Sequence, residues 1–224
     1  MILEDKVEAT RECLQQALSL AQVSKIAVAW TGGKDSSVAL ALWRETLRAG
    51  GCGFESVWAL NLDTGVKFPE VVDFRDSMAQ TWNLVLSVVR PEVDLTAYPL
   101  AQDPVQCCRD LKIRPLHQAV VSLGIDVLIT GVRADEHPER TSRSWLEKRS
   151  DPVFYIMHPL LHWTEIDIWS YTLQHNMPYC VLYDQGYRSL GCMPCTQPAF
   201  QQERSGRSGE KENRLHILRS LGYF

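Results

Sequence analysis

Four cysteines in two separate groups are the residues of this chain whose type and spacing point most directly to chemistry. Cys107 and Cys108 are adjacent, and Cys192 and Cys195 form a C-x-x-C pair far downstream. Four thiolates brought together by folding can hold zinc or an iron–sulfur cluster, and a C-x-x-C pair alone can act as a redox dithiol. Zinc is the weaker fit, because the chain has only one C-x-x-C pair and adjacent cysteines point awkwardly for a tetrahedral site.

A glycine-rich segment near the N-terminus has the composition of an anion-binding turn. It reads Trp30-Thr31-Gly32-Gly33-Lys34-Asp35-Ser36-Ser37 and lies between an apolar run and an expected helix. Backbone N–H groups in such a turn can bind phosphate, and the helix dipole favours negative charge. Lys34 adds a cation, and Ser36 can donate to a phosphate oxygen. The segment is not G-x-x-x-x-G-K-S/T, so a Walker-type NTPase is a poor match. An ordinary glycine turn is the alternative.

The composition excludes several classes of protein. The 224 residues carry 23 basic and 27 acidic side chains, a net charge of −4, which gives no overall electrostatic footprint for nucleic acid. There is no run of about 18 apolar residues to span a membrane, and the charged N-terminus has no apolar signal segment. We therefore expect a cytoplasmic protein with no membrane partner. Its remaining cysteines, Cys13, Cys52 and Cys180, are expected to be small buried apolar residues.

Apolar runs that alternate with amphipathic segments predict an α/β fold with a doubly wound parallel sheet. The expected strands are 25–30, 56–62, 84–89 and 125–130, and the expected helices are 4–22, 36–47, 69–82 and 107–123. Another helix is expected to begin after Thr164, with Asp167 as a weak capping-box partner. From about residue 176 the chain becomes irregular. We expect one domain over residues 1–200 and a flexible polar tail over 201–224.

The glycine-rich segment resembles the PP-loop, S-G-G-x-D-S, of the ATP pyrophosphatase family, with Thr31 in place of the first serine. Three later segments resemble those of the adenosine phosphosulfate (APS) and phosphoadenosine phosphosulfate (PAPS) reductases, at residues 63–70, 131–136 and 158–169. The similarity extends from about residue 25 to the C-terminus. It implies a Rossmann-like, adenine nucleotide alpha hydrolase fold, in which these segments lie at the sheet edge that binds ligands.

The cysteine segments resemble those of the assimilatory APS reductases. Residues 107–116 follow C-C-x-x-x-K-V/I-x-P-L, and residues 189–198 follow S-I/L-G-C-x-P-C-T-x-P. In that family the four cysteines bind a [4Fe-4S] cluster. The resemblance therefore implies that Cys107, Cys108, Cys192 and Cys195 hold one here, with zinc and a redox dithiol as the alternatives.

Two departures separate this chain from the reductases it resembles. Their catalytic cysteine stands in an E-C-G-L-H segment, whereas residues 212–216 here read E-N-R-L-H, so that Asn213 occupies the position of the nucleophile. A carboxamide cannot attack sulfur. The reductases also usually lack the Lys-Asp-Ser of the phosphate loop, which is intact here at residues 34–36. Both departures favour an enzyme that splits ATP between its α- and β-phosphates.

We therefore expect an ATP pyrophosphatase, which converts ATP to AMP and pyrophosphate with Mg²⁺ and activates an acceptor for sulfur incorporation. The combination resembles the ATP pyrophosphatase component of DNA phosphorothioation systems. That resemblance implies a cysteine desulfurase and other sulfur-transfer proteins as partners, and a nucleic acid substrate. A homodimer is a separate expectation. The predicted catalytic residues are Lys34, Asp35 and Arg133, whose forked donors suit phosphate. The predicted nucleotide-binding residues are Thr31, Gly32, Gly33, Ser36, Ser37, Asp63, Thr64, Gly65 and Gly131.

Two other functions stay open from the sequence. One is an APS or PAPS reductase whose nucleophile is supplied by another molecule. The other is a non-catalytic subunit that binds nucleotide, senses redox state and docks partners. Four basic residues of the tail either fold over substrate, follow a phosphate backbone or lie on a solvated disordered segment. They are Arg204, Arg207, Lys211 and Arg214.

Overall fold

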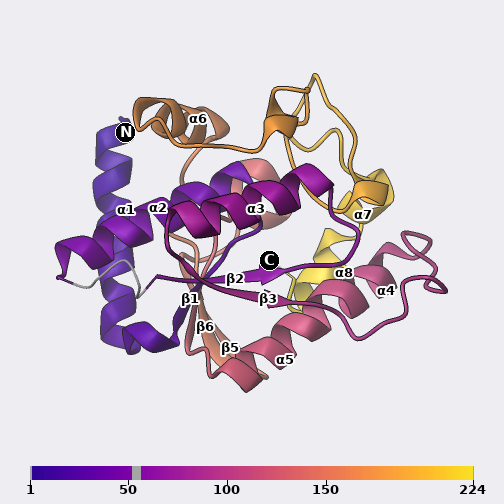
Figure 1. The fold of residues 1–224 in the computed structure, drawn as a ribbon, viewed down its shortest axis with the longest axis horizontal. Helices are drawn as coiled ribbons and strands as arrows, with labels where there is room; N and C mark the ends of the chain where they lie inside the picture. Colours follow the sequence, from indigo (N-terminus) through magenta and orange to yellow (C-terminus); the bar gives the residue numbers. More distant parts are fainter. Residues whose placement is uncertain (1, 52–56, 224) are drawn as a thin grey trace.

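A six-stranded sheet forms the centre of the molecule, with the strand order β3-β2-β1-β4-β6-β5 (Figure 1). The computed structural model describes residues 2–51 and 57–223. Neighbouring strands are parallel, except that β5 runs antiparallel to β6 at one edge. The strands are β1 (Ile26–Ala29), β2 (Trp58–Leu62), β3 (Val85–Val89), β4 (Val127–Ile129), β5 (Leu146–Ser150) and β6 (Val153–Met157).

Helices cover both faces of this sheet, so the predicted doubly wound α/β fold is confirmed (Figure 1). Strand β1 shows why. Ile26 and Val28 pack into a core with α1, α2, α3 and α6, whereas Ala27 and Ala29 pack into a second core with α5. Alternate side chains of a strand point to opposite faces, and both faces here are buried. The longer helices are α1 (Leu3–Leu20), α2 (Lys34–Ala49), α3 (Pro69–Thr81), α5 (Arg114–Leu123) and α6 (Glu165–Gln174).

The predicted start of α6 is confirmed in detail. Thr164 Oγ1 accepts a hydrogen bond from the backbone N–H of Asp167 at 3.3 Å, and the Asp167 carboxylate accepts one from the backbone N–H of Thr164 at 2.7 Å. This reciprocal pair satisfies two N–H groups that the first helical turn leaves without partners.

The predicted helix over 107–123 is interrupted. The structure has α4 (Pro104–Cys108), then a π-helical turn over Arg109–Ile113, then α5. Pro115 explains the interruption, because its ring lacks an N–H and would crowd the carbonyl four residues earlier in a regular helix. A wider turn before the proline relieves this crowding. It also gives the cysteine pair a helix end of its own, separate from α5.

The β5–β6 hairpin and the helices of the C-terminal segment were not predicted. Strand β5 contains Glu147, Lys148 and Arg149, because an edge strand can expose charged side chains and shows no apolar alternation. The apolar run of β6 was a usable signal. After residue 200 the chain forms α7 (Gly209–Glu212) and α8 (Leu215–Ser220), and Leu215 and Leu218 are buried against Cys108 and Ile113. The domain boundary and the flexibility of this segment stay predictions.

The three other cysteines carry a smaller prediction. Cys180 is buried, as predicted, whereas Cys13 is only half-buried and packs against the core. Cys52, like the first residue of the predicted strand 56–62, lies outside the described residues. Among the residues that the structure describes, no helix is both long enough and apolar enough to cross a membrane.

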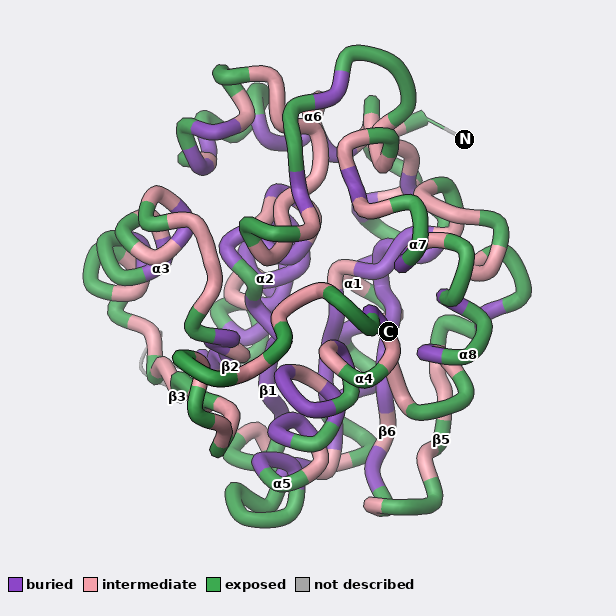
Figure 2. The backbone as a smooth tube through the Cα atoms, turned by 90° about the vertical axis from the view of Figure 1, so that its right-hand side faces the viewer, coloured by how far each residue is buried: buried purple, intermediate pink, exposed green. Residues whose placement is uncertain are grey.

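The carboxyl ends of the parallel strands open toward one side of the molecule. The loop that follows α6, together with α4, α7 and α8, lies on that side (Figure 1), which faces the viewer in Figure 2. Strand β1 pairs with β2 on one side and with β4 on the other, so the strand order reverses at β1. Open α/β sheets bind ligands at such a switch point.

Candidate active site at the carboxyl edge of the sheet

The glycine-rich turn between β1 and α2 is held by its own hydroxyl groups. Thr31 Oγ1 accepts a hydrogen bond from the backbone N–H of Gly33 at 3.2 Å, and Ser36 Oγ donates to the carbonyl of Gly33 at 3.0 Å. Ser37 Oγ accepts from the indole N–H of Trp30 at 3.0 Å in the core. Of the predicted nucleotide-binding hydroxyls, Ser37 therefore faces away from the sheet edge.

Gly131, which follows β4, packs its backbone against the same turn. A Cβ atom on Gly131 would lie 2.5 Å from the backbone nitrogen of Ser36 and 2.7 Å from the carbonyl carbon of Asp35. Backbone atoms in a packed turn cannot move aside, so only glycine permits this approach. The close packing places Arg133, two residues further on, beside Lys34 and Asp35.

The three predicted catalytic side chains meet in a buried ionic cluster. Arg133, which is fully buried, donates from Nε to Asp35 at 2.6 Å, and Lys34 Nζ lies 3.2 Å from the Asp35 carboxylate. Burial alone would raise the pKa of Asp35, but the charges of Lys34 and Arg133 outweigh it and hold that pKa below its ordinary value. The three residues that the sequence analysis proposed as catalytic are therefore close together in the structure, and their catalytic role stays a prediction.

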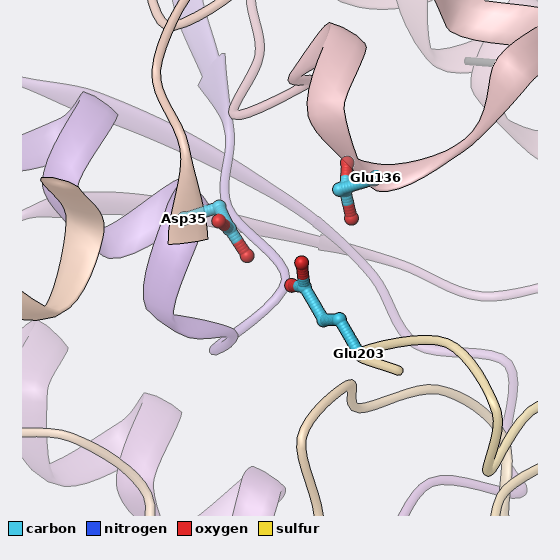
Figure 3. Close-up of side chains that lie close together, drawn as sticks. All are labelled: Asp35, Glu136 and Glu203. Atoms are coloured by element: carbon cyan, nitrogen blue, oxygen red, sulfur yellow. The ribbon is translucent and has the colours of Figure 1, made fainter. Parts of the chain in front are cut away.

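A fourth member of this cluster was not predicted. Glu203 comes from the C-terminal segment, and its carboxylate binds Lys34 Nζ with one oxygen and Arg133 Nη2 at 2.5 Å with the other. Figure 3 shows its carboxylate beside those of Asp35 and Glu136. Oxygens of these three acids lie within 4.8 Å of one another. Each already accepts from a lysine or an arginine, so a Mg²⁺ ion would first have to displace those partners.

The segment after β2 contributes to the site a turn at Asp63 and contacts with the C-x-x-C segment. Asp63 accepts a hydrogen bond from the backbone N–H of Gly65 at 3.0 Å and lies 3.4 Å from Arg75, so it shapes the turn. Thr64 Oγ1 lies 3.3 Å from the sulfur of Cys192. The backbone N–H of Met193 donates to the carbonyl of Val66 at 2.9 Å, which fixes the C-x-x-C segment against the sheet edge.

The four predicted metal-binding cysteines surround one small cavity, although they come from distant parts of the chain. Cys107 and Cys108 lie at the end of α4, whereas Cys192 directly precedes a 3₁₀ turn and Cys195 is the last residue of that turn. No three of these four sulfurs lie within 4.8 Å of one another. A tetrahedral zinc site, with Zn–S bonds of about 2.3 Å, would need sulfurs roughly 3.8 Å apart. The arrangement in the structure is wider than that.

A cavity of about 150 Å³ adjoins Cys192 at the ends of β1 and β2. Its floor is apolar and its rim carries basic side chains. The apolar lining includes Ala29, Leu60, Leu62, Val71, Ile113 and Leu116, and the polar lining includes Thr31, Thr64, Lys67, Lys112, Cys192, Arg207 and Tyr223. Such a combination of an apolar floor and a few convergent polar groups is typical of a small-molecule site.

Four cations stand around this cavity and the cysteines without a carboxylate partner. Lys67, Lys112, Arg207 and Lys211 form no ion pair within 4 Å with any acid of the described residues. Lys211 is 1% exposed, and its ammonium donates to Tyr223 Oη at 3.0 Å. Nε of the buried Arg207 has no hydrogen-bond partner among the described residues.

The positive charge of these residues changes the acidity of their neighbours. Burial alone would raise the pKa of Cys192, but the charge of Lys112, with smaller contributions from Thr64, Lys211 and Arg207, outweighs burial and lowers that pKa to about 7. The pKa of Tyr223 is likewise lowered to about 7 against the effect of burial, by Lys112 and Lys211. The region is therefore a strongly positive, partly dry environment.

These cations and Tyr223 are the residues that the sequence analysis did not select as site residues. Lys112 was visible as the lysine of the C-C-x-x-x-K pattern, and Arg207 and Lys211 were noted only as tail residues. Tyr223 could not have been selected from the sequence, because the residues around it form no pattern that predicts its packing against α4 and the turn that precedes α5.

Comparison with known proteins identifies the family. The sequence profile of the phosphoadenosine phosphosulfate reductase domain matches residues 25–198. The protein belongs to the phosphoadenosine phosphosulfate reductase family. It is 37% identical over 158 residues to an adenosine 5'-phosphosulfate reductase of Bacillus velezensis, covering 65% of this chain and 66% of the relative. It is 34% identical over 169 residues to the enzyme of the same name from Geobacillus thermodenitrificans, covering 70% of this chain and 71% of the relative.

Solved structures agree on the fold of this family member. The PAPS reductase of Candida auris, in a phosphate complex, superposes with a TM-score of 0.70 at 19% identity, over 84% of this chain and 90% of that one. The FMN adenylyltransferase of Candida glabrata, in complex with FMN and an ATP analogue, has a TM-score of 0.71 at 22% identity, over 88% of this chain and 65% of that one. The Rossmann-like architecture is thus shared by reductases and nucleotide-transferring enzymes.

The comparisons correct the predicted function. The expectation of an ATP pyrophosphatase, a hydrolase acting in DNA phosphorothioation, is wrong, because relatives about 35% identical are APS reductases. The phosphate loop misled the sequence analysis, since its intact Lys34 and Asp35 are paired with Arg133 and Glu203 rather than free. The names of these relatives do not mention an iron–sulfur cluster, so the comparisons add no support for it. The cluster, ATP, Mg²⁺, the homodimer and the predicted partners stay untested.

Proposed function

We propose that this protein is an APS or PAPS reductase whose attacking thiol is supplied by a second molecule. The observation that carries the proposal is the cavity beside Cys192, which is ringed by basic side chains that have no carboxylate partner in the part of the chain that the structure describes. Family membership supplies the class of reaction, and the curated relatives that match are named APS reductases. The chain spans 66% and 71% of the length of two of these relatives.

The charge around the cavity suits a sulfonucleotide. Unpaired buried cations are costly, since a charge loses its hydration and gains no partner in return. The phosphate and sulfate groups of APS are anions that Lys67, Lys112 and Arg207 can bind together. The apolar floor at the ends of β1 and β2 offers a surface for the sugar and base, at the switch point where α/β folds bind nucleotides.

The proposed reaction is a two-electron reduction by a dithiol. A thiolate of the second molecule attacks the sulfur of the sulfate group, the bond from that sulfur to the bridging oxygen breaks, and AMP leaves with the electron pair. A thiosulfonate is formed on the thiol. The second thiol of the same molecule then attacks the sulfenyl sulfur, which releases sulfite and leaves a disulfide. The basic residues at the rim would stabilise the charge that develops on the leaving phosphate.

An external thiol is needed because of Asn213. This residue follows α7 at the surface, exposed to solvent, and does not line the cavity. Its carboxamide cannot replace a nucleophilic cysteine. Cys192 is the one cysteine that lines the cavity among the described residues, and we assign it to the cysteine cluster instead.

We also propose that the four clustered cysteines hold a [4Fe-4S] cluster. Their sulfurs surround one cavity with spacing wider than zinc requires, and Lys112 and Lys211 stand beside them. When bound, such a cluster would carry negative charge, which offsets these cations, and would tie α4 to the C-x-x-C segment. Lys112 would then lie between the cluster and the substrate cavity.

The test is anaerobic turnover of the purified protein with APS or PAPS and a thioredoxin system as the dithiol. We expect sulfite and the leaving nucleotide in equal amounts, AMP from APS or adenosine 3',5'-bisphosphate from PAPS. We also expect a decrease of about 10²-fold in kcat/KM for Lys112→Ala and for Arg207→Ala. Incubation with ATP and Mg²⁺ should release no pyrophosphate. If neither sulfonucleotide binds to the protein nor yields sulfite with any dithiol, the proposed function is wrong.

A further inference from the structure

We infer that Glu203 is a positioning residue for the substrate cavity, and that the phosphate loop serves in this chain as its anchor. The inference rests on the proposed function for its substrate. Glu203 and Arg207 belong to one short segment, and they act at its two ends. The Glu203 carboxylate binds Lys34 and Arg133, whereas Arg207 lines the cavity beside Cys192.

The Glu203 side chain that serves as the anchor is buried and forms two ion pairs. The side chain of Glu203 is 9% exposed, and its two oxygens contact two different cations that are themselves almost fully buried. Arg133 and Lys34 are in turn joined through Asp35. Lys34 Nζ also donates to the carbonyl of Arg188 at 3.1 Å. A carboxylate held in this way fixes the position of its own backbone, because ion pairs between buried groups are hardly screened by solvent.

Backbone hydrogen bonds connect the fixed position of Glu203 to that of Arg207 at the cavity. The backbone N–H of Arg207 donates to the carbonyl of Arg204 at 2.9 Å, and the N–H of Gln197 donates to the carbonyl of Gly206 at 2.8 Å. The N–H of Ser208 donates to the carbonyl of Cys195 at 3.1 Å. Residues 203–208 are therefore attached at one end to the phosphate loop and at the other to the C-x-x-C segment. These attachments fix the position of Arg207, which lines the cavity.

Loss of the anchor should act on substrate binding through Arg207. In Glu203→Gln we expect KM for APS to rise about tenfold, with kcat within about threefold of the wild type, because a displaced binding group weakens ground state and transition state alike. A merely structural role would lower the amount of active protein and leave KM unchanged. Glu203→Asp, which keeps the charge, should recover part of the affinity.

A double-mutant cycle makes the link to Arg207 explicit. If Glu203 acts through Arg207, then adding Glu203→Gln to Arg207→Ala should not raise KM further. If instead the rise in KM of the double variant equals the product of the rises in the two single variants, the inference is wrong. Glu203→Gln removes a negative charge beside two buried cations, so electrostatics alone can destabilise this variant. The double variant Lys34→Met, Glu203→Gln keeps the net charge of the cluster and provides a second test of the inference. It should fold and show the same rise in KM.

A ligand-free measurement separates this inference from the proposed function. Hydrogen exchange at the amides of Arg207 and Ser208 should be at least tenfold faster in Glu203→Gln than in the wild type. The matched control is Glu210→Gln, in the same segment, since Glu210 is exposed and forms no ion pair with the described residues. Unchanged exchange in Glu203→Gln would overturn the anchor even if APS is the substrate. Faster exchange in a protein that does not bind APS would leave the anchor standing and remove the proposed function.

Discussion

The guanidinium of Arg207 lies directly against the backbone of Gly191. A Cβ atom on Gly191 would come within 2.2 to 2.5 Å of three guanidinium atoms of Arg207. Gly191 thus leaves the space through which Arg207 reaches the cavity. The contact joins the C-x-x-C segment to the C-terminal segment at the point where we place the substrate.

Gly191→Ala should therefore displace Arg207 without unfolding the protein. The atoms that would clash are at the far end of a flexible side chain, so we expect a loss of only about 1 kcal/mol in stability and a KM for APS close to that of Arg207→Ala. Steady-state kinetics and thermal unfolding check both parts. Gly209→Ala is the matched control, because a Cβ there would meet no atom within 4 Å. Unchanged KM in Gly191→Ala would argue against Arg207 as a binding residue.

Asn213→Cys should convert the protein into one that carries its own nucleophile. With APS and no external thiol, we expect an S-sulfonate on the new cysteine, detected by mass spectrometry of the intact protein, since a thiolate can attack where a carboxamide cannot. Ser220→Cys, exposed on α8, is the control and should stay unmodified. Because position 213 lies at the surface outside the cavity, this adduct requires the C-terminal segment to move toward the bound substrate, and absence of the adduct would mean that it does not.

The cysteine cluster can be tested by composition. Protein purified without oxygen should contain about four iron and four sulfide per chain and absorb broadly in the visible range. Cys195→Ser should lose most of this iron, whereas Cys13→Ser, which alters a half-buried cysteine away from the cluster, should keep it. One zinc per chain in place of iron would contradict the assignment.

Glu147 should make stability depend on pH in the acid range. Burial alone would raise its pKa, but hydrogen bonding to His158 and the charge of Arg143 outweigh it and lower the pKa from 4.5 to about 2. A carboxylate with a lowered folded-state pKa stabilises the fold above its ordinary pKa, and this contribution is lost as the pH falls from about 4.5 to about 2. After allowance for solvent screening, we expect on the order of 1 kcal/mol.

Chemical denaturation of Glu147→Gln against wild type at several pH values measures this contribution. The two proteins should differ most near pH 6 and should converge as the pH approaches 2. A difference that stays constant over that range would mean that the Glu147 side chain acts through packing and not through its charge.

Much of the fold could be predicted from local pattern. The strands of the parallel core are short apolar runs followed by glycine or turn residues. The residue types of Thr164 and Asp167 predict the N-terminal cap of α6. The elements missed are those whose stability comes from distant partners. Strand β5 is charged and pairs only because β6 lies beside it, and α8 forms where Leu215 and Leu218 meet Cys108 and Ile113.

For the site, the resemblance of sequence segments to those of known families indicated that the four cysteines form one group and that Lys34, Asp35 and Arg133 lie at the sheet edge. The tertiary structure decided what those groups are free to do. Glu203, far along the chain, pairs with Lys34 of the phosphate loop and with Arg133, whereas Lys112, Arg207 and Lys211 have no acid partner among the described residues. Whether a charge is available to a ligand depends on which opposite charge the fold brings within a few ångströms, and no local pattern in the sequence contains that distance.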